Sequence, residues 1–227
     1  MNAENIVREL KRHSNPKNVA GMARFGINPA NTLGISIHVL RGMAKELGVN
    51  HDLDHQLWAS GIHEARILAA MIDDPSKVTA RQMESWVKDF YSWDVCDQVC
   101  SNLFDKTNLA YSKALAWSGR REEFVKRAGF ALMAALAFHD KKAPDSAFRE
   151  FLSAIKRESN DDRNFVKKAV NWALRQVGKR NLGLNREAVG TAREIRKVRS
   201  KSARWIANDA LRELTNPTLQ ARLRNRP

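Results

Sequence analysis

Two residues four positions apart have the chemistry to act on a sugar. A four-residue step places Trp93 and Asp97 on nearly the same side of an α-helix. We expect them just beyond the edge of a continuous apolar face, which is made by Val95, Cys96, Val99, Cys100 and Leu103. A side chain at such an edge meets both core and solvent. An aromatic ring beside a carboxylate, in a chain of net charge +14, indicates a site that holds a polyanion and stabilises a developing cation.

The charge of the chain favours a nucleic-acid partner. Lysine and arginine number 39 against 25 acidic residues. Such an excess neutralises phosphates and releases counterions when a nucleic acid binds. The alternatives are a basic, solvated surface without a specific ligand, and a partner among acidic membranes or proteins.

Composition places the chain among globular proteins. With 227 residues, 43% hydrophobic and 28% charged, it is long enough for one large domain or a repeat array. No stretch approaches the roughly 20 apolar residues of a membrane span, and no secretory signal is visible. Its two cysteines lie on one predicted helix and make no disulfide framework. We therefore expect no membrane partner and a cytoplasmic, nucleoid-associated location.

Helical periodicity runs through the whole chain, and we find no convincing strand. Gly48, Pro75 and Gly183 indicate helix ends, Thr79 is a plausible helix N-cap, and residues 25–35 form the clearest loop. The sequence predicts a single domain over residues 1–227 with helices at 3–12, 16–24, 36–47, 51–59, 62–72, 79–89, 92–103, 109–116, 121–138, 144–156, 161–179, 185–197 and 201–213.

A weak internal repeat gives the architecture. The segment 124–128, Phe-Val-Lys-Arg-Ala, returns 41 residues later as Phe-Val-Lys-Lys-Ala at 165–169, with a fainter echo at Trp205. A helical period near 40 is typical of HEAT-like helix pairs, which stack because no single unit buries its apolar face alone. The alternative is a chance likeness between two amphipathic helices. We predict an all-α, HEAT-like or ARM-type superhelical solenoid whose basic inner surface cradles a duplex.

A second tryptophan lies among cations. On the helix around 165–179, Trp172 sits at the edge of the apolar half, beside the half that carries Lys168, Arg175 and Lys179. Tryptophan packs against a sugar or base while neighbouring cations engage phosphates. The alternative is a tryptophan at the core edge, screened by long basic side chains.

Further cations are candidates for phosphate contacts. Arg127 occupies the repeat position of Lys168, and Ala131 and Ala134 leave room beside it; a surface ion pair with Glu123 is the alternative. A cluster near the C-terminus predicts a backbone-binding patch, with a solvated face as the alternative, and contains Arg193, Arg196, Lys197, Arg199, Lys201 and Arg204.

Metal-binding patterns are weaker. Cys96 and Cys100 lie among valines and favour buried structural thiols. His51 and His55 have the helical spacing of metal ligands, but Asp52 and Asp54 around them favour an ordinary acidic helix start. The pair at 63–64, His-Glu, lacks the second histidine of a zincin motif. We therefore expect no metal site.

The order of several segments resembles the AlkD-like DNA alkylation repair family from about residue 20 to residue 214. The pairing of Trp-Asp-x-x-Asp at 93–97 with Lys-Ala-x-x-Trp-x-Leu-Arg at 168–175 is its most specific part. The other segments are Leu-Arg-Gly-Met-Ala-Lys at 40–45, Leu-Trp at 57–58, His-Glu-Ala-Arg at 63–66 and Phe-Val-Lys-Arg at 124–127.

The resemblance implies a monofunctional DNA glycosylase that releases N3- and N7-alkylated purines without turning the damaged base into a pocket. Asp97 matches the catalytic aspartate of the family. Trp93 and Trp172 match the tryptophans that flank the deoxyribose, and Arg127 matches an arginine near the backbone of the damaged nucleotide.

The expected partner is double-stranded DNA with alkylated purines, bound by a monomer that needs no cofactor. The rival interpretation is a non-catalytic HEAT-like scaffold that binds nucleic acid, and the joint presence of Trp93, Asp97 and Trp172 argues against it. A protein-interaction solenoid poorly explains the charge of +14.

Overall fold

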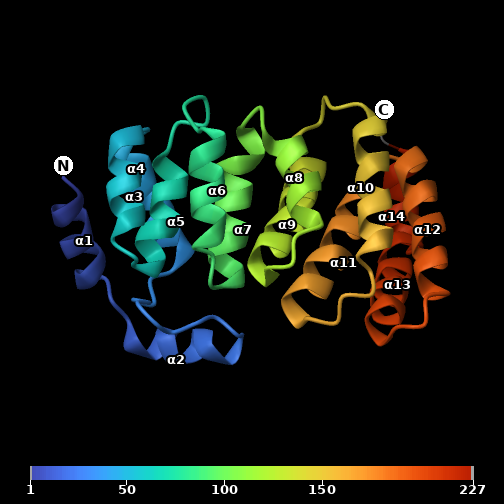
Figure 1. Ribbon diagram of the computed structural model, residues 1–227, viewed down its shortest axis with the longest axis horizontal. Coiled ribbons are helices and arrows are strands. Elements are labelled where there is room, and N and C mark those ends of the chain that lie inside the picture. The colour runs from blue at the N-terminus through green and yellow to red at the C-terminus, as the bar shows by residue number, and fades with distance from the viewer. Residues whose placement is uncertain (1, 226–227) are drawn as a thin grey trace. The chain divides into compact units, whose positions relative to one another are not determined.

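The computed structural model describes residues 2–225, and every regular element in that range is a helix (Figure 1). The α-helices are α1 (Ala3–Arg12), α2 (Pro16–Arg24), α3 (Ile37–Leu47), α4 (His51–Ala59), α5 (His63–Ile72), α6 (Ala80–Lys88), α7 (Trp93–Asn102), α8 (Ala110–Ser118), α9 (Glu123–His139), α10 (Asp145–Arg157), α11 (Asn164–Gly178), α12 (Leu182–Arg196), α13 (Lys201–Leu214) and α14 (Pro217–Arg224), and the short 3₁₀ helix η1 spans Phe104–Lys106. The predicted all-α class is confirmed. No described helix has the length and apolar character required to cross a bilayer.

The predicted helices are present with ends within three residues of the structure, and local signals account for most boundaries. The Thr79 side chain accepts a hydrogen bond from the amide of Gln82, as an N-cap should. Gly48 ends α3 with φ of 66°, a left-handed conformation that glycine adopts without strain. Cys96 and Cys100 are both buried, as predicted.

Two predictions near the C-terminus were wrong. Gly183 was interpreted as a helix stop, yet it lies in the first turn of α12, because the Asn181 side chain caps that helix by accepting from the amide of Leu184 at 2.8 Å. Helix α14 was missed altogether. Its signal is an Asn216 N-cap followed by Pro217 at the first helical position.

The described chain divides after Asn108 into two compact units. The single domain over residues 1–227 stays a prediction, and each unit is described by itself. In the first unit, α5 packs against α3, α4 and α7, so it forms the centre of that unit. Trp58 of α4 stacks on Trp86 of α6 with ring centroids 3.9 Å apart and planes 3° from parallel. Buried Phe104 lies next to this pair.

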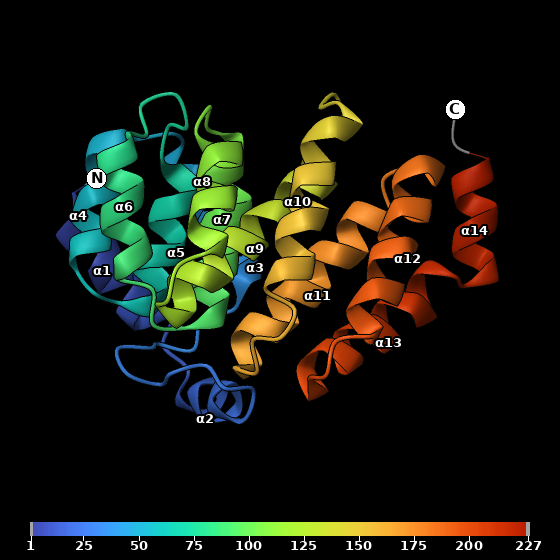
Figure 2. The same cartoon turned by 45° about the vertical axis from the view of Figure 1, so that its right-hand side comes forward.

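Helix α2 runs crosswise to the other helices of the first unit, across one end of them (Figures 1 and 2). None of its residues is fully buried. It is tied to the predicted loop through the Asn18 amide, which donates to the carbonyl of Gly34 at 2.9 Å. Gly34 has φ of 77°, and a Cβ there would lie 2.3 Å from the Asn15 carbonyl oxygen. Only glycine allows this close approach.

The second unit consists of stacked helix pairs. One row contains α8, α10 and α12, the other contains α9, α11 and α13, and neighbours in each row pack together. The predicted repeat is visible in this stacking, because Phe124 and Phe165 open equivalent helices and their ring centroids lie 5.6 Å apart. Helix α9 is almost wholly buried, which explains its nearly continuous apolar sequence.

The α8–α9 crossing depends on a glycine. A Cβ at Gly129 would lie 2.5 Å from the Ser118 amide nitrogen and 2.9 Å from the Ala114 carbonyl oxygen, both backbone atoms. We expect Gly129→Ala to lower the free energy of unfolding by about 1–3 kcal/mol, because the helices must separate. Urea denaturation measures this change.

Gly190, in the interior of α12, is the matched control, since a Cβ added there would meet nothing within 4 Å. Gly190→Ala should stabilise the protein by about 0.4–1 kcal/mol, because alanine restricts the unfolded chain. Equal behaviour of the two variants would contradict the close helix crossing.

Candidate functional site

Helix α7 carries Trp93 and Asp97 one turn apart at the edge of its buried face. Val95 and Val99 are fully buried, as are the two cysteines beside them. Trp93 and Asp97 both keep part of their surface. Asp97 is therefore neither sealed under the packing nor fully in water, which is the placement that the spacing predicts.

The indole of Trp93 is anchored. Its Nε1–H donates to the carbonyl of Phe25 at 3.1 Å, so the turn after α2 fixes the ring at the start of α7. A depression of about 540 Å³ adjoins this contact and is lined by Met22, Phe25, Ile37 and Trp93 among others. The Phe25 side chain is 76% exposed. Trp93 and Phe25 thus place aromatic surface next to the predicted catalytic helix.

A polar network holds the first turn of α7. His63 of α5 lies with Nε2 2.8 Å from a carboxylate oxygen of Asp94, and the Ser92 hydroxyl donates to the other oxygen at 2.5 Å. Burial opposes ionisation of Asp94, but the hydrogen bonds from His63 and Ser92 outweigh it and hold its pKa below the usual range. The Tyr91 hydroxyl lies 3.3 Å from His63 Nδ1, and burial raises the pKa of Tyr91 to about 12. Tyr91 therefore stays protonated at neutral pH.

Glu64, the next residue of α5, fixes the loop beside α2. Its carboxylate accepts hydrogen bonds from the amides of Leu33, Gly34 and Ile35 at 2.8, 2.7 and 3.2 Å. The Glu64 side chain is buried, so these bonds replace its hydration. The loop that the sequence marks as irregular is thereby held in one conformation.

Sequence reasoning missed the positioning roles of His63, Glu64 and Asp94. The pair 63–64 was weighed only as an incomplete zinc motif. Its partners are the start of another helix and the backbone amides of a loop, and no residue spacing marks either of them.

Arg127 of α9 is buried, with 5% of its surface exposed. Its Nη1 donates to the carbonyl of Phe165 at 2.6 Å and so connects α9 to α11. The ion pair with Glu123 stays the alternative for this side chain. A phosphate contact by Arg127 stays a prediction, and the structure adds a role in positioning α11.

Helix α11 carries Lys168, Trp172 and Arg175 on successive turns, and Lys179 is its C-cap. Lys168 is exposed, and Trp172 keeps part of its surface. The two later cations pair with α13, where Glu213 lies 2.7 Å from Arg175 and 2.8 Å from Lys179. Burial opposes ionisation of Glu213, but these cations hold its pKa below the usual range, so the pairs persist at neutral pH. Their charge is thus partly neutralised within the protein.

The basic patch predicted near the C-terminus spans the end of α12, its C-cap Lys197, Arg199 after it, and the first turn of α13, which carries Lys201 and Arg204. Arg193, Arg196 and Lys197 are all exposed. Lys197 lies 2.7 Å from Glu194 in a surface pair, which contributes little stability. Arg193 and Arg196 form no ion pair within residues 2–225. The structure therefore leaves Arg193 and Arg196 on the surface, whereas it pairs Arg175 and Lys179 with Glu213.

The predicted site residues fall into two groups that the two units contain separately. Trp93 and Asp97 belong to the first unit, and Arg127 and Trp172 belong to the second. Within the second unit, the Arg127–Phe165 hydrogen bond links the α9 and α11 residues. The exposed cations of α12 lie on a different helix from Trp172.

Comparisons with known proteins agree with this architecture. A family model described as "DNA alkylation repair enzyme" matches residues 6–214. A solved structure described as "A new family of proteins related to the HEAT-like repeat DNA glycosylases with affinity for branched DNA structures" is similar, with a TM-score of 0.77 and 20% sequence identity, and the match covers 94% of this chain and 95% of that chain. This likeness confirms the predicted HEAT-like fold. No curated protein matches the sequence.

The role of Glu64 can be tested by Glu64→Gln. The amide has one acceptor oxygen and no charge, so at least one loop N–H loses its partner. We expect a loss of about 1–3 kcal/mol in the free energy of unfolding and faster hydrogen exchange at residues 33–35. Glu46→Gln, at an exposed position on α3, is the matched control and should change neither quantity. Unchanged exchange at residues 33–35 in Glu64→Gln would refute the clamp.

Proposed function

Since the chain belongs to the DNA alkylation repair enzyme family, as its motifs predict, we propose that it is a monofunctional DNA glycosylase that releases N3- and N7-alkylated purines from duplex DNA. The observation that carries the proposal is the placement of Asp97 at the half-buried edge of α7, one turn from the anchored ring of Trp93. Supporting it are the excess of basic residues and the second tryptophan, Trp172, on α11.

The reaction needs little beyond a well-placed anion. Alkylation at N7 or N3 gives the purine a formal positive charge, so the base leaves with the electron pair of the glycosidic bond and needs no prior protonation. The sugar becomes oxocarbenium-like, and water then adds to C1′ and loses a proton. A carboxylate about 4 Å from this cation contributes up to ~4 kcal/mol at an effective dielectric constant near 20, which corresponds to roughly a thousandfold in rate.

Each predicted residue has a role in this reaction. Asp97 stabilises the sugar cation and orients the attacking water. Trp93 and Trp172 present their π faces to the sugar, which gives contact area and cation–π stabilisation. A neutral purine is a poorer leaving group than an alkylated one. The enzyme therefore selects bases whose glycosidic bond breaks easily. We propose that the base stays in the duplex, that the protein acts as a monomer, and that excision needs no metal or organic cofactor.

Duplex binding is assigned to the cations of the second unit. Lys168, Arg193, Arg196 and Lys197 are exposed and would contact phosphates. Arg175 and Lys179 are also proposed ligands, and they would exchange Glu213 for phosphate when DNA binds. Arg127 is proposed to contact the backbone of the damaged nucleotide while it holds α11 in place.

A second candidate function is binding of branched DNA without base excision. It is favoured by the description of the similar solved structure, whose family has affinity for branched DNA structures. The two candidates differ in chemistry, because only the glycosylase releases a free base.

Asp97→Asn separates the two candidates. We expect the wild-type protein to release free N7-methylguanine from a methylated duplex, and Asp97→Asn to do so about a thousandfold more slowly, because the amide carries no charge. Duplex affinity should stay nearly unchanged. Single-turnover assays of released base and fluorescence anisotropy measure the two quantities.

Asp162→Asn, at an exposed position in the second unit, is the control for loss of one carboxylate and should excise normally. Equal excision by Asp97→Asn and the wild type would remove Asp97 from the mechanism. A wild-type protein that binds a four-way junction but releases no base would establish the second candidate instead.

The proposed phosphate contacts predict a salt dependence. Each contact contributes about 0.9 to the slope of log affinity against log salt concentration, so Lys168→Gln should reduce the magnitude of that slope by about 0.9. Lys45→Gln makes the same change in net charge at an exposed site on α3 and should leave the slope unchanged. Equal slopes for the two variants would show that Lys168 has no specific phosphate contact.

A further inference from the structure

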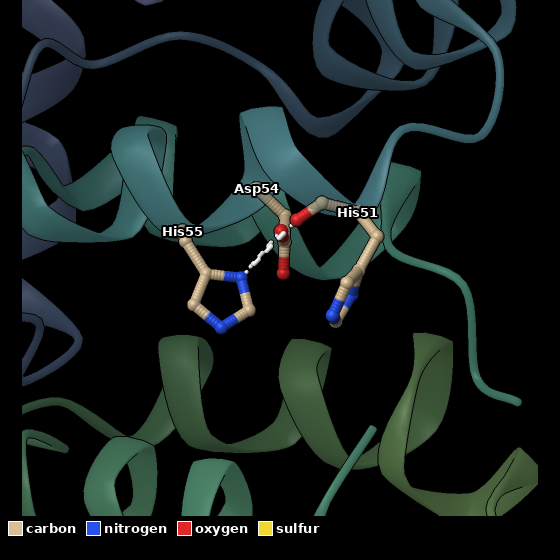
Figure 3. Close-up of side chains that lie close together, drawn as sticks. All are labelled: His51, Asp54 and His55. Atoms are coloured by element: carbon tan, nitrogen blue, oxygen red, sulfur yellow. Dashed lines mark hydrogen bonds and ion pairs between the residues drawn. The ribbon is translucent and has the colours of Figure 1, made fainter. Parts of the chain in front are cut away.

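The first turns of α4 bring two imidazoles and a carboxylate together. One ligand atom each from His51, Asp54 and His55 can be chosen so that all three lie within 4.8 Å of one another. Figure 3 shows the carboxylate of Asp54 between the two rings. The histidines stand at i and i+4, the spacing with which one helix face presents two imidazoles to a metal ion.

His55 Nδ1 lies 2.7 Å from an oxygen of Asp54, and an ion held by both side chains would replace that hydrogen bond. The His51 imidazole is already oriented for coordination, because its Nδ1 lies 2.6 Å from a carboxylate oxygen of Asp73. A carboxylate at Nδ1 places the proton there and leaves Nε2 with its lone pair. This carboxylate–histidine arrangement is the one that typically supports metal-bound histidines, because it fixes the tautomer and makes the ring more basic.

The buried carboxylates of Asp54 and Asp73 have few cationic partners. The side chains of Asp54 and Asp73 are fully buried, and the Gln82 amide bridges them by donating at 3.3 and 2.7 Å. In the described part of the chain, their ion pairs are with the two histidines, and no lysine or arginine joins them. Two carboxylates buried together favour a cation beside them.

The cluster can be reached from solvent. His55 is exposed, and His51 lines a depression of about 260 Å³ that Asp52 and Asp74 also line. Lys77 on the same rim offsets part of their charge, and the two acids leave a net negative charge that attracts a cation toward the cluster. Ligand atoms around one tetrahedral zinc ion stand roughly 3.3 Å apart, so the three groups need only a modest closure. The His55 side chain, 50% exposed, has the freedom to make it.

We propose that His51, Asp54 and His55 form a binding site for a late first-row divalent cation such as Zn²⁺. The sequence alone favours an acidic helix start here; the buried carboxylates behind the rings are what change the interpretation. Imidazole nitrogen with carboxylate oxygen suits these metals. The ion would connect the start of α4 to Asp73 at the end of α5 and to Gln82 of α6, so its role is to stabilise the first unit rather than to take part in excision.

The first test is calorimetric titration of the metal-free protein with ZnCl₂, using His55→Asn and His38→Asn. Asparagine keeps an N–H donor near the position of Nδ1 and removes Nε2, so Asp54 retains a partner. His38 is an exposed histidine on α3 and serves as the matched control. We expect one ion per chain, an affinity at least about tenfold weaker in His55→Asn, and no change in His38→Asn.

The proposal is overturned if His55→Asn binds as the wild type does, if both variants weaken binding equally, or if the wild type takes up no zinc. A second measurement needs no variant. X-ray absorption of the zinc-loaded wild-type protein should show two imidazole ligands and carboxylate oxygen at about 2.0–2.2 Å. A zinc ion with oxygen ligands alone would also overturn it.

Discussion

The placement of the proposed site depends on one boundary, the edge of α7 where its fully buried face meets the solvent-exposed side. A carboxylate sealed in an apolar interior loses its charge, and one in open water acts weakly on its neighbours. Asp97 lies between these extremes because Val95 and Val99 bury the adjacent face. The remainder of the first unit fixes where that boundary runs. The His63–Asp94 pair holds the start of α7, and the Phe25 carbonyl holds the ring of Trp93.

Several acidic residues hold helices and loops in place by accepting hydrogen bonds or forming ion pairs. The Glu64 carboxylate accepts hydrogen bonds from three loop amides, and the Asp94 carboxylate is hydrogen-bonded to His63 and Ser92. Neither carboxylate is therefore available to react with a substrate. In the second unit, Glu213 forms ion pairs with Arg175 and Lys179. Acidic side chains of this basic protein thus hold helices and loops in place and neutralise part of its positive charge. The exposed cations Lys168, Arg193, Arg196 and Lys197 are among those proposed to contact DNA.

The sequence predicted what depends on local patterns. Apolar spacing located α7 and its edge residues, and the recurrence of Phe-Val-Lys at 124 and 165 revealed the stacked helix pairs. The side-chain contacts between neighbouring repeats could not be predicted from the sequence, although they share one sequence separation. Arg127 meets Phe165, Asn171 meets Asp209 and Arg175 meets Glu213, each at a separation of 38 residues. That offset is one repeat of 41 less about one helical turn, and it depends on how neighbouring helices slide against each other. This register is set by how the neighbouring helices pack, and the sequence of a single helix does not indicate it.

The central claim is that the protein accelerates loss of a cationic base by stabilising a positive charge on the sugar. The most direct measurement is the secondary deuterium isotope effect at C1′ during single-turnover release of N7-methylguanine. The account predicts a normal effect, with the deuterated sugar reacting more slowly, because C1′ becomes planar and electron-poor before water adds. An effect of unity in a reaction limited by bond cleavage, or no release of base at all, would contradict it.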